Sequence, residues 1–221
     1  MDRLSPRIVA ELLHHEGLVR EAYRDSAGIW TWSVGITDAS GHRVGRYRDN
    51  PQSIEHCLEV FVWLLTTRYL PAVLAAFGTH APSEAQLAAA ISFHWNTGAI
   101  ARATWLKRFL AGNAGEAQST FLDWCRPPEV LPRRRCERDL FFDARWSGDG
   151  GVLLYDVGKP GYRPVNPRRI QVAPQLAALM AAASEPEPAA FSAQDSGPRG
   201  PAVEPLPPAP PRRSWFERLF D

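Results

Sequence analysis

Three polar residues near the start of the chain, Glu16, Asp25 and Thr31, could carry out acid–base chemistry together. Glu16 ends an apolar helical pattern, Asp25 precedes a turn, and Thr31 lies in a segment with strand-like alternation. A helix end, a turn and a strand can direct a carboxylic acid, a carboxylate and a hydroxyl into one cleft. Hydrolysis of a glycosidic bond needs this combination, with one carboxyl group as the acid and another that activates water.

The position of Glu16 also allows a structural interpretation. Ser5 followed by Pro6 indicates a helix start, because a hydroxyl caps the first turn and proline fits the first helical position. Val9, Leu12 and Glu16 then recur at helical spacing, so Glu16 lies near the apolar face. A glutamate at such a helix end could equally be a capping or ion-paired residue.

The spacing of Glu16, eight residues, Asp25, five residues and Thr31 resembles the catalytic signature of the phage-type lysozymes, the muramidases of glycoside hydrolase family 24. The surrounding residues match that family's usual sequence at Glu16-Gly17, Ala22-Tyr23-Arg24-Asp25, Gly28-Ile29-Trp30-Thr31 and Gly35. Two positions depart from it: Ile36 stands where His is common, and Ser33 stands where Gly is common. The His is usually structural, so its loss affects local packing more than chemistry.

The resemblance covers roughly residues 8 to 146 and implies an α+β, mainly helical lysozyme-like fold. It implies a small β-ribbon lobe and a larger helical lobe joined by a long helix. The implied reaction is hydrolysis of the β-1,4 bond between N-acetylmuramic acid and N-acetylglucosamine in peptidoglycan. Glu16 would be the general acid, and Asp25 with Thr31 would position and activate water. The resemblance implies no metal and no other cofactor.

Two other functions stay open. A lytic transglycosylase cuts the same bond without water and needs the glutamate but not Asp25 and Thr31. Its products would carry an anhydro-muramyl end. A wall-binding or particle-structural protein on a lysozyme scaffold would bind peptidoglycan without turnover.

Three further residues are candidates for substrate binding or support. Trp30 could face a sugar, although we expect core packing for at least one of Trp30 and Trp32. Asn96 lies in a segment that resembles the family's aromatic-Asn-x-Gly turn, and it could hydrogen-bond substrate or cap the next helix. Residues 133–137 resemble the family's Arg-Arg-x-x-Glu helix, in which an arginine supports the catalytic glutamate. We assign this role to Arg134, with Arg133 as the alternative one residue earlier.

The composition limits the classes of molecule that the protein is expected to bind. The chain has 221 residues, 45% of them hydrophobic, and a net charge of +1, so no global field draws it to nucleic acid. Three arginines at 133–135 lack the interleaved aromatic residues of a nucleic-acid patch. Three cysteines without CxxC spacing argue against a zinc site or a disulfide framework. We expect peptidoglycan glycan strands as the partner, no nucleic acid, and a monomer.

The chain divides into three parts by composition. Residues 1–146 are predicted to form the catalytic domain, in which a helix over 53–74 has a kink or break at Pro71. Residues 87–94 are apolar on several faces and are expected at the centre of the helical lobe. Residues 147–183 are predicted to form a hairpin and helix packed on the domain. The Pro- and Ala-rich tail, 184–221, is expected to be disordered, with a short amphipathic end that could contact a membrane.

Localisation follows from two expected absences. The first seven residues contain no apolar signal core, and no unbroken run reaches about 18 apolar residues. We therefore expect no membrane-spanning helix and a cytoplasmic location in the producing cell. The protein would act on the wall after its release or after delivery by a particle.

Overall fold

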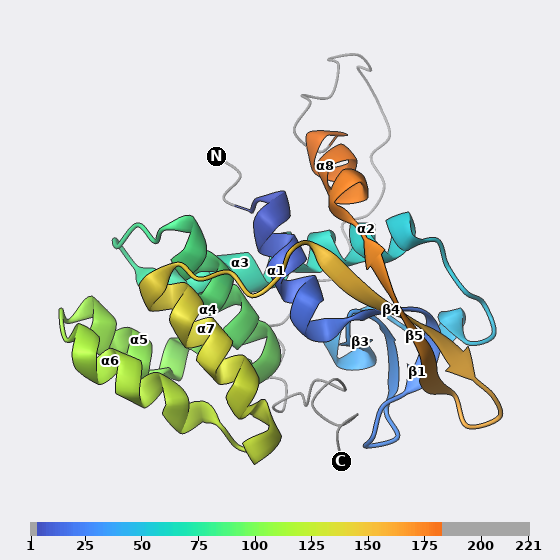
Figure 1. The fold of residues 1–221 in the computed structure, drawn as a ribbon, viewed down its shortest axis with the longest axis horizontal. Helices are drawn as coiled ribbons and strands as arrows, with labels where there is room; N and C mark the ends of the chain where they lie inside the picture. The colour runs from blue at the N-terminus through green and yellow to red at the C-terminus, as the bar shows by residue number, and fades with distance from the viewer. Residues whose placement is uncertain (1–3, 183–221) are drawn as a thin grey trace, which may run out of the picture.

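The computed structural model describes residues 4–182 as two lobes, one mainly helical and a smaller one built around a sheet (Figure 1). Residues 1–3 and 183–221, which include the predicted tail at 184–221 and its amphipathic end, lie outside the described residues. The predicted α+β, mainly helical fold is confirmed.

The elements have the following bounds. The α-helices are α1 (Pro6–Glu16), α2 (Ile54–Leu64), α3 (Leu70–Phe77), α4 (Glu84–Thr97), α5 (Thr104–Leu110), α6 (Ala114–Phe121), α7 (Leu131–Asp143) and α8 (Ala173–Ala182). The strands are β1 (Leu18–Arg24), β2 (Trp30–Ser33), β3 (Ile36–Thr37), β4 (Gly151–Gly158) and β5 (Arg163–Gln171). Short helical turns are η1 (Asp38–Ser40), η2 (Gly45–Tyr47), η3 (Leu65–Tyr69), η4 (Ile100–Arg102), η5 (Leu122–Trp124) and η6 (Pro128–Val130).

Helix α1 begins and ends where the sequence predicts. The side chain of Ser5 accepts a hydrogen bond from the N–H of Ile8, and a proline follows it at the first helical position. Gly17 ends the helix with φ of 65°, and its N–H donates to the carbonyl of Leu13 over 2.9 Å. Glu16 is therefore the last residue of α1, next to the first strand.

One sheet joins the N-terminal ribbon to the C-terminal extension. Its strand order is β3-β2-β1-β4-β5, in which β1, β2 and β3 pair antiparallel as a ribbon. Strand β4 pairs parallel to β1, with Leu18 opposite Leu154 and Val19 opposite Tyr155, and β5 returns antiparallel along β4. In Figure 1 this hairpin lies beside the blue β1. The predicted hairpin thus extends the sheet of the ribbon, a pairing that no local sequence pattern indicates.

The long helix continues through Pro71. Helices α2 and α3 are joined by the π-helical turn η3, and the N–H of Leu70 donates to the carbonyl of Leu65. Proline has no N–H to donate, and a π turn before it lets the chain stay helical to Phe77. By length and composition alone, the 24-residue run Ile54–Phe77 could cross a membrane, since an 18-residue window within it has a mean hydropathy of 1.6. Polar residues interrupt this segment, so it contains no unbroken apolar run of the kind on which the prediction of no membrane-spanning helix rests. One helix of this kind is weak evidence for a membrane span.

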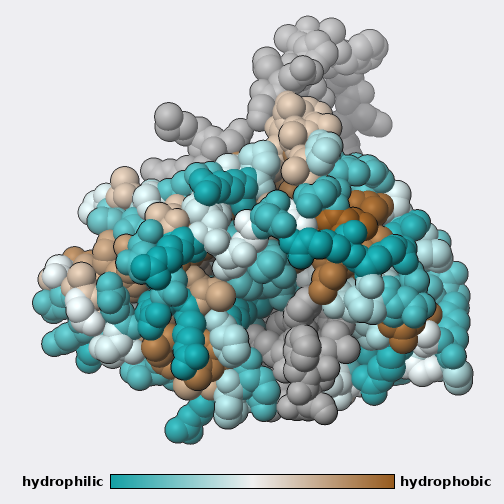
Figure 2. All heavy atoms as spheres, in the orientation of Figure 1, coloured by the Kyte–Doolittle hydropathy of each residue, from teal (hydrophilic) through white to brown (hydrophobic). Residues whose placement is uncertain are grey.

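Helix α4 is the central helix of the helical lobe. Eleven of its 14 residues are buried, and it contacts α1, α3 and α7. This confirms the prediction from its apolar faces. Figure 2 shows that the face turned toward the viewer is mostly hydrophilic on both lobes, with the more apolar α8 at the top.

His94, on α4, is a partly buried group that the fold keeps uncharged. Its Nδ1 atom has no hydrogen-bond partner in the described part of the chain. Its ring packs edge-on against Tyr69, with 5.5 Å between the ring centroids. Burial lowers the pKa of His94 to about 4, from an ordinary value of 6.5. As pH falls below 6.5, the unfolded chain therefore takes up the proton before the folded protein does.

We expect this difference to make unfolding easier in mild acid. Between pH 7 and pH 4.5 His94 alone should lower the free energy of unfolding by about 2–3 kcal/mol. Replacing His94 by Phe should remove that part of the pH dependence. Denaturant unfolding of both proteins at pH 7 and pH 4.5 measures the difference. An equal fall in the free energy of unfolding in both proteins would mean that His94 takes up its proton as easily in the folded state as in the unfolded chain.

Candidate active site

Glu16 lies between two elements from distant parts of the chain. On the helical side, Nη1 of Arg133 on α7 donates to Oε1 of Glu16. On the ribbon side, Gly35 lies at the turn between β2 and β3 with φ of 79°, and a Cβ atom built there would be 3.6 Å from Oε2 of Glu16. Glu16 is only 4% exposed, so its carboxyl group is fixed where the two lobes meet.

Arg133 is part of a buried network of charges on α7 and α4. Its Nε donates to Oε1 of Glu137 over 2.8 Å, and its Nη2 donates to Oγ of Ser92 over 3.0 Å. Arg134 donates through Nη1 to Oε2 of Glu137 and through Nη2 to Oδ1 of Asn96. All five side chains are buried. Such charges are tolerated only when each is paired, so the network holds its members in one arrangement.

Glu137 is the centre of this network. Burial by itself would raise its pKa, but the guanidinium groups of Arg134 and Arg133 and the hydroxyl of Ser92 lower the pKa below its ordinary value of 4.5. The stabilisation from this carboxylate is thus complete above pH 4.5 and is lost as pH falls through the lowered pKa. The Arg-Arg-x-x-Glu pattern contains Glu137, but the pattern alone indicates no role for it.

The structure corrects the register assigned to α7. We assigned the support of Glu16 to Arg134, but Arg133 is the residue that donates to Oε1 of Glu16, and Arg134 donates to Glu137 and Asn96. Consecutive residues point about 100° apart around a helix. Because both arginines are buried, the sequence pattern could not tell which of them faces α1.

Asn96 lies inside α4 and is not a cap. The helix continues to Thr97 and ends at Gly98, which has φ of 65°. The following helical segments begin after Ala99 and Ala103. The prediction that Asn96 caps the next helix is therefore wrong, whereas its contact with substrate stays a prediction.

Asp25 is fixed by a tight turn. Its Oδ1 accepts hydrogen bonds of 2.9 Å from the N–H groups of Ala27 and Ile29, and its carbonyl accepts from Gly28. The Ile29 carbonyl in turn accepts from the N–H of Asp25 and from Oγ1 of Thr31. Asp25 and Thr31 are thereby brought together around one carbonyl group. Within residues 4–182, Oδ2 of Asp25 has no hydrogen-bond partner.

The two tryptophans of β2 have different surroundings. Trp32 is fully buried and stacks on Tyr47, with 3.8 Å between the ring centroids. This confirms the prediction that at least one of the two tryptophans packs in the core. Trp30 is half-buried, and the guanidinium carbon of Arg24 lies 4.4 Å from the centroid of its ring. The ring of Tyr162 packs edge-on against Trp30, with 5.1 Å between the two centroids. Trp30 therefore contacts the C-terminal extension beside Asp25, and its contact with a sugar stays a prediction.

The two departures from the family's usual residues have different structural consequences. Ser33 has φ of 55°, a left-handed conformation that glycine adopts more easily, and its hydroxyl donates to the carbonyl of Cys57. This conformation explains why glycine is common at that position. Ile36 is fully buried opposite Trp32, so an apolar side chain fills the place where His is common.

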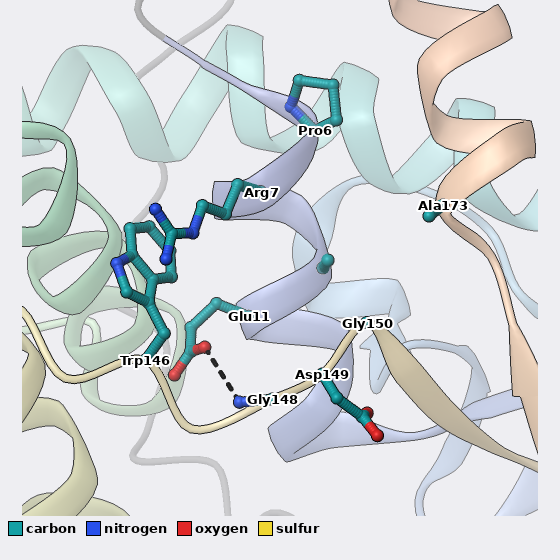
Figure 3. Close-up of a pocket in the computed structure, with 9 residues that line it drawn as sticks. Pro6, Arg7, Glu11, Trp146, Gly148, Asp149, Gly150 and Ala173 are labelled. Atoms are coloured by element: carbon teal, nitrogen blue, oxygen red, sulfur yellow. Dashed lines mark hydrogen bonds between the residues drawn. The ribbon is translucent and has the colours of Figure 1, made fainter.

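A cavity of about 330 Å³ is lined by none of the candidate residues (Figure 3). It lies between α1 and residues 146–150, which lead into β4. Arg7 lies 3.9 Å over the ring of Trp146, and the buried carboxylate of Glu11 accepts hydrogen bonds from the N–H groups of Ser147 and Gly148. These contacts attach the extension to α1. In the described part of the chain, no group of three or more His, Cys, Asp or Glu side chains could hold a metal ion.

The geometry therefore provides one carboxyl group fixed by Arg133 at the junction of the lobes, and a second on a turn of the ribbon. The turn that begins at Ser33, two residues after Thr31, brings Gly35 against Glu16. Such an arrangement can donate a proton from one side and hold water with a carboxylate and a hydroxyl from the other.

Known proteins resemble this chain in sequence and in fold. Residues 13–137 match the family model described as phage lysozyme. The structure resembles the endolysin from Escherichia coli O157:H7 phage FAHEc1, with a TM-score of 0.54, 23% identity, and coverage of 66% of this chain and 96% of the endolysin. It also resembles a variant of P22 lysozyme, with a TM-score of 0.53, 29% identity, and coverage of 64% and 99%. No curated protein sequence matches the chain.

Proposed function

Since the chain belongs to the phage lysozyme family and is on that ground a peptidoglycan hydrolase, we propose that it is an N-acetylmuramidase. It would hydrolyse the β-1,4 bond between N-acetylmuramic acid and N-acetylglucosamine. The observation that carries this proposal is the placing of Glu16 by Arg133 beside a ribbon whose turn orients Asp25 and Thr31.

Glu16 is proposed as the general acid. Oε2 lies on the side of the ribbon, where a Cβ atom at Gly35 would come within 3.6 Å of it, and we place the transferable proton on this oxygen. This oxygen would protonate the leaving glycosidic oxygen. The buried network behind Arg133 supports the proposal because it fixes the orientation of the carboxyl group before substrate arrives.

Asp25 and Thr31 are proposed to hold the attacking water. Two backbone N–H groups occupy Oδ1 of Asp25, which leaves Oδ2 to accept a proton from water. Thr31 donates its own hydroxyl hydrogen to the Ile29 carbonyl, so its oxygen can accept a hydrogen bond from the same water. Attack by this water on the face opposite the leaving group would invert the anomeric centre.

The product ends test this function. Purified full-length protein is incubated with peptidoglycan, and the soluble fragments are analysed by mass. Hydrolysis at the proposed bond should give fragments with a reducing N-acetylmuramic acid end. Anhydro-muramyl ends would identify a lytic transglycosylase, and binding without fragments would identify a wall-binding protein. Reducing N-acetylglucosamine ends would show that the neighbouring bond is cut.

We expect the two arginines of α7 to differ in their effect on turnover. Arg133 reaches Glu137, Glu16 and Ser92 through three different nitrogens of its planar guanidinium. The single nitrogen of a lysine cannot span these positions, so Arg133→Lys should lower kcat by up to about a hundredfold. Arg134→Lys is the matched variant, because its ammonium can still pair with Glu137. It should lower kcat much less for a similar loss of stability.

Steady-state kinetics and denaturant unfolding of both variants measure this contrast. The two kcat values are compared at temperatures where each variant remains folded. A larger loss of kcat in Arg134→Lys than in Arg133→Lys would contradict the assignment of Arg133 to Glu16.

A further inference from the structure

The C-terminal hairpin reaches the turn that carries Asp25. The family match ends at residue 137, so β4, β5 and the tight connection between them lie outside it. Strand β4 is nevertheless fixed in the sheet beside β1, the strand that leads from Glu16 to Asp25. The far end of this hairpin therefore lies at the same end of the sheet as Asp25.

The contacts at this end are hydrogen bonds to the backbone of the Asp25 turn. Nη1 of Arg163 donates to the carbonyl of Asp25 over 2.6 Å and to the carbonyl of Arg24 over 3.3 Å. The N–H of Arg24 donates to the carbonyl of Tyr162 over 2.7 Å. Two consecutive residues of the hairpin, Tyr162 and Arg163, thus hold Arg24, the last residue of β1, and Asp25, which follows it.

The hairpin tip is itself anchored to the ribbon lobe. The hydroxyl of Tyr162 donates to the carboxylate of Asp49 over 3.0 Å, and Nζ of Lys159 lies 2.6 Å from the same carboxylate. Lys159 also pairs with Glu21 on β1 at 3.0 Å. The edge contact between Tyr162 and Trp30 adds a link to β2. Arg163 is therefore presented from a fixed position, although its own side chain is exposed.

These contacts matter because the carboxyl group of Asp25 is oriented within its own turn. Its Oδ1 bonds go to Ala27 and Ile29, so wherever the turn moves, the carboxylate moves with it. The backbone carbonyl of Asp25 is the point at which Arg163 ties the turn to the rest of the sheet. Displacing a reacting group by about 1 Å can lower a rate by as much as a hundredfold.

We propose that Arg163, supported by Tyr162, is a positioning residue for Asp25, so that the C-terminal hairpin is part of the catalytic architecture. This inference rests on the proposed function of Asp25. Arg163 holds the turn through its backbone and takes no part in proton transfer.

Arg163→Met tests the proposal, because methionine keeps much of the side-chain length and removes every donor. The kcat for peptidoglycan should fall about tenfold to a hundredfold, with KM changed by less than about threefold. Arg163→Lys should restore most of the kcat, because one N–H donor suffices for the Asp25 carbonyl. Arg168→Met is the matched control on the same strand. It loses only a cross-strand pair with Asp156 and should keep the wild-type kcat.

A double-mutant cycle separates positioning from general stability. If Arg163 acts through Asp25, Arg163→Met should lower the kcat of the wild type but not the residual kcat of Asp25→Asn. An equal loss in both backgrounds, or an equal loss in Arg168→Met, would overturn the proposal. If Asp25→Asn alone leaves kcat unchanged, the proposed function of Asp25 fails instead. If Asp25→Asn lowers kcat and Arg163→Met does not, only the positioning role of Arg163 fails.

Discussion

Replacing Glu16 by Gln is expected to lower kcat for peptidoglycan by roughly a thousandfold while the protein stays folded. The amide has the shape of the carboxyl group, and its oxygen can still accept the N–H of Arg133. It has no proton to give to the leaving oxygen. Because Arg133 also pairs with Glu137, it does not lose its last charged partner, and the free energy of unfolding should change by about 2 kcal/mol or less.

Glu11→Gln provides the matched control. Glu11 lies on the same helix and is 3% exposed, but it binds Ser147 and Gly148 at the cavity between α1 and residues 146–150. This variant should lose stability and keep its kcat. The measurements are the initial rate of wall clearance and denaturant unfolding. Undiminished clearance by folded Glu16→Gln would remove Glu16 from the role of the acid, and an equal loss in both variants would point to a general effect of charge removal.

The local geometry of the candidate site could be predicted because it is made by neighbours in the sequence. Ser5 and Gly17 set the two ends of α1, which makes Glu16 its last residue. Asp25 and Thr31 are joined through the Ile29 carbonyl within one turn. The six positions from Asp25 to Thr31 in the sequence are therefore enough to predict that the two side chains lie close together. Their chemical roles stay predictions until turnover is measured.

Contacts between distant segments could not be predicted in the same way. Arg133 meets Glu16 across 117 positions, and only the packing of α7 on α4, which α1 also contacts, decides that it does so in place of Arg134. The burial of these charges did have a sequence signal: positions 133, 137, 140 and 141 recur at helical spacing, so the two charged residues share a helix face with the apolar Leu140 and Phe141. The contact of Arg163 with Asp25 spans 138 positions and depends on the parallel pairing of β4 with β1. No local pattern in either strand indicates this pairing.

Replacing Asp25 by Asn is expected to lower kcat by roughly a hundredfold to ten-thousandfold. The Oδ1 atom of the amide can still accept the N–H groups of Ala27 and Ile29, so the turn should keep its shape. An NH₂ group then replaces Oδ2 and cannot take a proton from water. Asp38→Asn is the matched control, since Asp38 also accepts a backbone N–H, from Val44, in the same lobe. It should keep the wild-type kcat.

The anomeric configuration of fresh product distinguishes the two roles that Asp25 could have. If Asp25 activates water, the β-linked substrate yields an α product, and NMR of the first turnovers should show this anomer before mutarotation mixes it. If Asp25 attacks the sugar itself, a covalent glycosyl-enzyme forms and the product is β. The hydroxyl of Thr31 favours the first route, because it shares the Ile29 carbonyl with Asp25 and can hold water beside Oδ2. A β product from the wild-type protein would overturn the water mechanism and would still leave Glu16 as the acid.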